Sequence, residues 1–169
     1  MPVTLTTAKV IVTVIAALSS GLDLGSVRDE INRKVQQVFS DGAGADQANA
    51  VFHDRRTLAA SGTESLDLAG SLVDGLGRAL TFTKIKAVIV IASDGNTNNV
   101  QVTRPAANGL PIFLAAGDGL ALTPGGIFVF VDPSAAGVTV TAGTGDLFTL
   151  TNSAAGTGVT YDVIIIGTV

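Results

Sequence analysis

The sequence is poor in the residue types that carry most of the chemistry of proteins. It contains no cysteine, which excludes disulfides, thiolate nucleophiles and thiolate metal sites. It contains one histidine, too few for a metal site built on two or three imidazole rings. It has no tryptophan and a single tyrosine, which weakens a carbohydrate-binding interpretation, because wide aromatic faces with a polar tip usually stack on sugar rings.

Charge is scarce as well. Charged residues form 14% of the 169 residues, against about 25% in average proteins, and the formal net charge is −4. From residue 87 onward the only basic residue is Arg104, so this half lacks the basic stripe that nucleic-acid binding requires. We therefore expect no direct nucleic-acid partner. A surface with so little charge is typical of a surface that is covered by other copies of the chain or by other proteins.

Long apolar runs are missing too. The longest such tract near the N-terminus, Val10 to Leu18, is too short to span a bilayer and is interrupted by Thr13. Only Lys9 precedes it, and β-branched residues rather than leucines dominate it, which is not typical of a signal peptide. The sequence thus predicts neither a membrane partner nor secretion.

What the chain does have is a regular series of short β-type segments. Residues 84–169 alternate such segments with Gly-rich turns at spacings typical of a β-sandwich or jelly roll. Alternation places Val100 and Val102 on one face of their strand, and predicts Phe148 and Leu150 as inward-facing. "SDGNTNN" is expected to be a hairpin connection. The expected strands are "IKAVIVIA", "NNVQVTR", "LPIFLAA", "LALT", "IFVFVD", "VTVTA", "LFTLTN" and "VTYDVIIIG".

The N-terminal part is less regular. "VTLTTAKVIVTVIAAL" is rich in Val, Ile and Thr and favours a strand, so residues 1–20 are expected to form an arm or strand. Residues 21–169 are expected to form a single β-sandwich body, in which Leu58, Leu66 and Leu68 point inward. The segment 26–39 fits either a helix or a strand. The predicted fold is therefore all-β, a β-sandwich or jelly-roll-like body with an extended N-terminal arm and at most a short helix.

The lone histidine, His53, lies in "DGAGADQANAVFHDRR", a cluster that deserves a chemical test. A Ser/His/Asp triad is compatible with one histidine, but no G-x-S-x-G nucleophile elbow occurs in the chain. We interpret the segment as a structural corner. In it, His53 and Asp54 bond backbone groups, while Arg55 and Arg56 form ion pairs on the surface or between subunits.

A second motif, "DGNTNN", resembles the start of a calcium loop, with oxygen ligands at Asp94, Asn96 and Asn98. The position that needs a bidentate glutamate is Pro105, so a polar turn is the better interpretation, although a looser cation site stays open. The stretches "GAGA" and "GTGD" lack the Lys and the helix of phosphate-binding loops. We therefore predict no enzyme, no cofactor, and no catalytic, cofactor-binding or metal-binding residues.

Several motifs together resemble a known family. The chain contains "DGAGADQANAVFHDRRTLAASGTESLDLAG", "NTNNVQV" and the closing "VTYDVIIIGTV". Over roughly residues 20–169 it is similar to a family of small virion structural proteins of tailed bacteriophages. In that family the segment before the "DG-G" turn reads as a strand, which favours a strand for residues 31–39. The chain departs from the pattern by its unusual charge between Arg28 and Lys34.

The resemblance implies a virion structural protein rather than an enzyme. The most specific expectation is a capsid decoration, or cement, protein that binds the major capsid protein as a homotrimer on the virion surface and is assembled in the cytoplasm of the bacterial host. The N-terminal arm would add a strand to the sheet of a neighbour. The alternatives are a tail, neck or fibre-base component, or a carbohydrate-binding, host-adhesion module.

Overall fold

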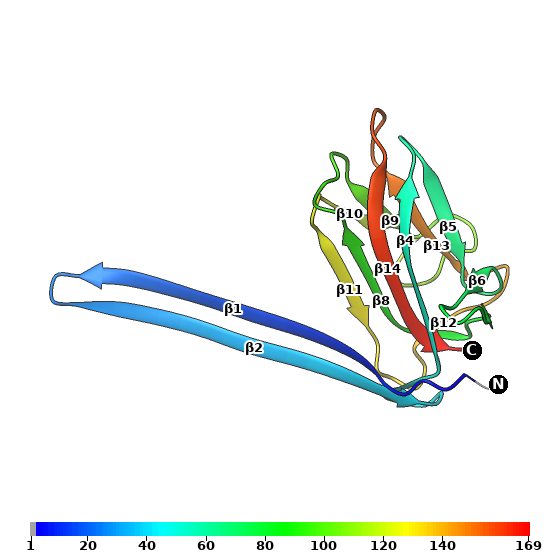
Figure 1. The fold of residues 1–169 in the computed structure, drawn as a ribbon, viewed down its shortest axis with the longest axis horizontal. Coiled ribbons are helices and arrows are strands. Elements are labelled where there is room, and N and C mark those ends of the chain that lie inside the picture. The colour runs from blue at the N-terminus through cyan, green and yellow to red at the C-terminus, as the bar shows by residue number, and fades with distance from the viewer. Residues whose placement is uncertain (1–2) are drawn as a thin grey trace.

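The computed structural model describes residues 3–169, and this part of the chain contains strands and turns but no helix. The body is a sandwich of two antiparallel sheets (Figure 1). One sheet has the order β11-β8-β14-β4, with β12 also paired to β8; the other has the order β10-β9-β13-β5. The strands of the first sheet are β4 (Ala50–Leu58), β8 (Lys84–Ala92), β11 (Ile127–Val131), β12 (Val138–Thr139) and β14 (Val159–Thr168). Those of the second are β5 (Thr63–Asp67), β9 (Val100–Thr103), β10 (Gly119–Leu122) and β13 (Leu147–Asn152).

Most connections in the body cross from one sheet to the other. The chain passes from β4 to β5, from β8 to β9, from β10 to β11 and from β13 to β14, and each of these steps changes sheet. This order is that of a jelly-roll-like sandwich and confirms the predicted fold class. The expected hairpin at "SDGNTNN" is wrong, because residues 93–99 join β8 to a strand of the opposite sheet.

The core lies between the two sheets. Phe52, Val88 and Val163 from the first sheet pack in one cluster with Val102 and Phe148 from the second. The side chains that alternation placed inward are buried, which confirms that part of the prediction: they are Leu58, Leu66, Leu68, Val100, Val102, Phe148 and Leu150. Covering both inner faces in this way is what makes the body stable without disulfides.

The N-terminal region is a long β-hairpin that projects from the body (Figure 1). β1 (Ala8–Leu22) pairs with β2 (Gly25–Asp41) in one unbroken antiparallel register, from Ala8↔Phe39 to Leu22↔Gly25. The arm therefore reaches Asp41 rather than ending at residue 20, and that expected boundary falls inside β1. Residues 26–39 are strand, because the run of β-branched residues in β1 offers them a partner along their whole length.

The base of the arm is anchored to the outer face of the first sheet. Ala8 and Phe39 are buried there in a cluster with Ala48, Ala87 and Ile166. Ala48 belongs to the short β3 (Gln47–Ala48), which pairs in parallel with the end of β2. The arm thus leaves the body from a fixed, apolar attachment.

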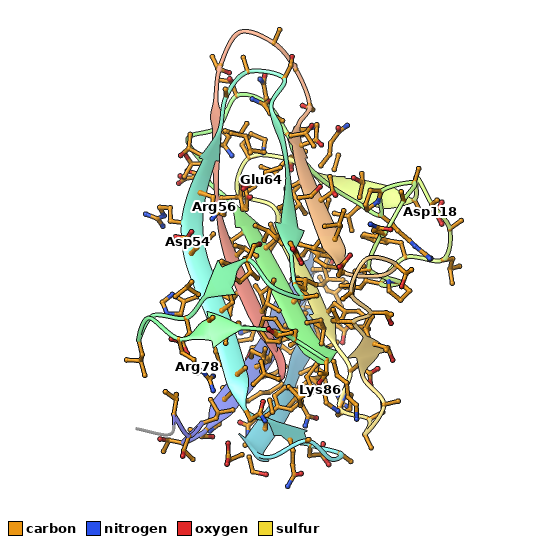
Figure 2. The ribbon with its side chains drawn as sticks, turned by 90° about the vertical axis from the view of Figure 1, so that its right-hand side faces the viewer. Asp54, Arg56, Glu64, Arg78, Lys86 and Asp118 are labelled. Carbon is orange, nitrogen blue, oxygen red and sulfur yellow. The ribbon has the colours of Figure 1, made fainter. Side chains whose placement is uncertain are left out.

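A buried lysine adds a polar clamp at the same place. The Lys86 side chain is fully buried, and its Nζ donates to the carbonyl oxygens of Gly44, at 3.2 Å, and of Ser134. Burial lowers the pKa of Lys86. Gly42 begins the loop between β2 and β3, which contains Gly44, and its φ of 139° is a backbone conformation that favours glycine. Figure 2 shows Lys86 at this end of the body.

Two further segments differ from, or add to, the predicted strands. "LPIFLAA" is not a strand but a series of turns, in which the Arg104 guanidinium donates to the carbonyls of Phe113 and Leu114 at 2.9 and 3.0 Å. β6 (Leu72–Val73) and β7 (Ala79–Leu80) form a small separate hairpin. Within residues 3–169 no helix is long and apolar enough to cross a membrane.

Candidate functional site

The histidine of the predicted corner lies in the middle of β4. His53 is exposed on the outer face of the first sheet, opposite Ile164 of β14. The glycine-rich part of the segment does turn, but residues 53–56 continue a straight strand. The corner interpretation is therefore wrong for these four residues. Strand alternation instead separates them into two pairs, His53 and Arg55 outside, Asp54 and Arg56 toward the opposite sheet.

The inner pair belongs to a charged cluster that joins the two sheets (Figure 2). Arg56 donates through Nε to Glu64 Oε2 of β5 at 2.8 Å, and through Nη1 to Asp54 Oδ2 at 2.8 Å. The Tyr161 hydroxyl of β14 donates to the other oxygen of Glu64. Burial and this bond to Glu64 raise the pKa of Tyr161, and Glu64 raises that of Arg56. The charged groups of the cluster are therefore paired with one another, and their contacts connect β4 and β14 of the first sheet to β5 of the second.

Of the outer pair, Arg55 makes an ion pair within the chain. Arg55 donates through Nε and Nη2 to the two oxygens of Asp162 at 2.6 and 2.8 Å, across β4 and β14. This bidentate contact lowers the pKa of Asp162. The expectation of ion pairs at Arg55 and Arg56 is confirmed, and in both cases the partners lie on the same chain.

The segment that resembles a calcium loop is held in place by hydrogen bonds of its own asparagine side chains. Asn96 donates to the Thr160 carbonyl at 2.9 Å and accepts from the Thr160 amide at 2.8 Å. Asn98 Nδ2 lies 3.0 Å from Asn152 Oδ1 and 3.1 Å from the Thr157 carbonyl. These contacts favour the polar-turn interpretation. Over residues 3–169, moreover, no three His, Cys, Asp or Glu side chains are grouped in a way that would hold a metal ion.

The most unusual feature of the molecule is exposed aliphatic surface on the arm. The register and the alternation of side chains give the hairpin two different faces. One face, called here the polar arm face, includes Lys9, Arg28, Glu30 and Lys34, together with the exposed Ile11 and Ile15. The other is called the apolar arm face, because aliphatic residues predominate on it, although Asp29 and Arg33 also lie there. Its exposed large aliphatic side chains are Val12, Val14, Leu18, Leu22, Val27, Ile31 and Val35.

The apolar arm face meets a second aliphatic surface at its base. Between the first residues of the arm, 9–13, and the outer face of the first sheet lies a groove of about 870 Å³, called here the elbow groove. The body side of the groove is formed by Ile89, Ile127, Val129, Val131, Ile164 and Ile166. Sequence reasoning missed both surfaces. The signal of the arm face was present in residues 8–39, but it appears only when the strands are paired in their register. The body side of the groove combines residues of β8, β11 and β14, which are far apart in the sequence.

Comparison of the chain with protein-family models, with curated proteins and with solved structures gave no match. Interpretation of the site therefore depends on its geometry and on the motifs of the sequence. The polar clusters are engaged in holding the fold, whereas the apolar arm face and the elbow groove are uncovered. Such surfaces are suited to contact with other proteins rather than to chemistry.

Proposed function

We propose that the protein is a structural component of a bacteriophage virion, and specifically a capsid decoration protein that binds the major capsid protein as a homotrimer. The observation that carries the proposal is the projecting arm with its apolar face. A 15-residue strand spans about 50 Å, enough to reach across a neighbouring subunit. The resemblance of several sequence motifs to those of small virion proteins is in line with the same interpretation.

The physical role of such a protein follows from these surfaces. A compact body would sit on the outside of the capsid, and the arm would bury aliphatic side chains against a neighbour. Each buried aliphatic side chain stabilises the contact by about 1.5–3 kcal/mol before the cost of association. Many identical contacts would clamp adjacent capsid subunits after the shell expands and raise its resistance to internal DNA pressure.

The proposal is tested by adding the purified chain to expanded, undecorated shells of the phage's major capsid protein. Cryo-electron microscopy is expected to show density at local threefold positions. The number of bound copies should be in a fixed ratio to the number of capsid subunits. Unexpanded shells are the control and should bind less. Density at the tail, neck or fibre base of complete virions, with bare shells, would favour that alternative location and overturn the decoration assignment.

The carbohydrate-binding alternative receives no support from the surface. All seven phenylalanines and Tyr161 are buried or half-buried, and the exposed large apolar side chains are aliphatic. An aliphatic surface lacks the ring face that stacks on a sugar. A glycan array is expected to show no specific binding, and a reproducible glycan ligand would contradict this part of the proposal.

A further inference from the structure

The apolar arm face is too large to be an ordinary exposed surface. Seven large aliphatic side chains lie on it, with Leu18 72% exposed and Ile31 53% exposed. A two-stranded hairpin is only marginally stable by itself in water, and monomeric proteins rarely leave an apolar patch of this size uncovered. The arm therefore needs a partner surface along its length.

The arm cannot find that surface on its own body. Ala8 and Phe39 are fixed in the anchoring cluster and residues 9–13 line the elbow groove, while the rest of the hairpin projects away from the sandwich (Figure 1). The elbow groove consequently stays open, with Ile127 62% and Val129 40% exposed. Each chain thus carries one uncovered apolar arm and one uncovered apolar groove.

The two surfaces match each other in shape and chemistry. Both are faces of β-sheet with mainly aliphatic side chains, and such faces pack about 10 Å apart in sandwiches. The charged residues of the arm face are Asp29 and Arg33. Among the residues that line the groove only Lys9 carries a charge. The strands β11, β8 and β14 under the groove are 5, 9 and 10 residues long, so one groove covers about 17–34 Å of the arm and one contact buries about 350–700 Å² in total. One such contact is smaller than a specific interface, so the assembly depends on the second contact that a closed ring gives every chain.

We propose that the apolar arm face of one chain packs in the elbow groove of a second copy of the same chain. The contact is heterologous, because arm and groove are different surfaces, and it must close into a ring to avoid an open fibre. Three copies would close it as the proposed homotrimer, with two such contacts for every chain. The inference rests on the proposed self-association and not on the capsid partner, so the two can fail separately.

The test compares charge substitutions on the two faces of the arm. Ile31→Asp places a carboxylate on the apolar arm face, and the control Ile15→Asp makes the same change on the polar arm face, where Ile15 is 72% exposed. Light scattering coupled to size-exclusion chromatography is expected to give an oligomer for the wild type and Ile15→Asp, and a single chain for Ile31→Asp. Val35→Asp, on the same face as Ile31, provides a second variant if Ile31→Asp fails to fold.

The groove is tested in the same way. Val129→Asp is expected to give a single chain, whereas Val73→Asp, a matched change at a 51%-exposed position of β6, should leave the oligomer intact. Mixing Ile31→Asp with Val129→Asp supplies one intact groove and one intact arm, and is expected to restore dimers. Circular dichroism should be the same for all variants.

Three results would overturn the inference. They are a wild-type chain that is monomeric at micromolar concentration, equal masses for Ile31→Asp and Ile15→Asp, and an oligomer that survives Val129→Asp. The last result would point to arm-against-arm packing. An oligomer that behaves as expected but does not bind capsid shells would leave this inference standing and contradict only the proposed function.

Discussion

At the scale of single residues, the polar side chains described above hold the strands and sheets of the body together. Alternation along β4 places Asp54 and Arg56 on the opposite side from His53 and Arg55, but the sequence interpretation put a corner there instead of a strand. The partner of Arg56 was not predictable, because Glu64 lies in the other sheet and nothing in the sequence indicates which strands face one another. The sequence therefore predicted ion pairs but not their role in joining the sheets.

The bond between the sheets leads to a prediction for Glu64. Glu64→Gln removes the negative charge beside Arg56 and leaves one oxygen acceptor for the two donors Arg56 and Tyr161, and should lower the free energy of unfolding by about 1–3 kcal/mol, because one buried donor loses its partner. Urea denaturation measures the change. The control is Glu30→Gln, which affects an exposed pair with Arg28 and should cost less than about 0.5 kcal/mol. Equal effects of the two changes would contradict the assigned role.

Tyr161 should make stability depend on alkaline pH. Its pKa in the folded protein is raised above the ordinary value of 10.0, so the native state holds the phenolic proton more tightly than the unfolded state. Its contribution is therefore fully present below about pH 10 and declines above that value. The measurement is the difference in unfolding free energy between wild type and Tyr161→Phe from pH 7 to 11. A difference that stays constant to pH 11 would refute the prediction.

At the scale of elements, the connections between strands were harder to predict than the strands. Turn residues mark where "SDGNTNN" leaves β8, but hairpins and crossovers between sheets use the same residue types. Strand pairing also determines that residues 26–39 form a strand, although their local sequence pattern fits a helix as well. Val12 opposite Val35 illustrates the kind of cross-strand contact that settles such a segment.

The crossover from β8 to β9 depends on Asn98. Its amide contacts Asn152 and the carbonyls of Ala154 and Thr157, so it fastens this loop to the loop between β13 and β14. Asn98→Ala should destabilise the protein by about 1–2 kcal/mol, as measured by thermal unfolding. Asn99→Ala is the matched control, since Asn99 bonds Ser153 through its main chain. A larger loss from the control would contradict this account.

At the scale of the whole molecule, the sequence predicted the class of fold better than the overall shape of the protein. Short strands, Gly-rich turns and low charge were sufficient for an all-β sandwich. An N-terminal arm was predicted for residues 1–20, but its extension to Asp41 as a projecting hairpin was not, because an apolar strand pair looks alike in sequence whether it lies in a core or stands free. The uncovered surface is what distinguishes the two cases.

Assembly should be visible in hydrogen–deuterium exchange. If the arm is covered in the oligomer, amides of β1 and β2 exchange slowly there and markedly faster in the single-chain variant Ile31→Asp, while amides of β8 and β14 are unchanged in both. Mass spectrometry of peptides from residues 8–41 measures the difference, with Ile15→Asp as the control. Equally fast exchange in the wild-type oligomer would mean that the arm stays exposed.

The attachment of the arm gives it the properties of a lever. Over about 50 Å, a rotation of about 1° at the base moves the tip by about 0.9 Å. The direction of the tip is therefore set by a few groups near the pivot, among them Phe39, Gly42 and Lys86. Adjustments of a few degrees there would let identical chains reach neighbours at unequal spacings, as on a curved surface, without any change in the body.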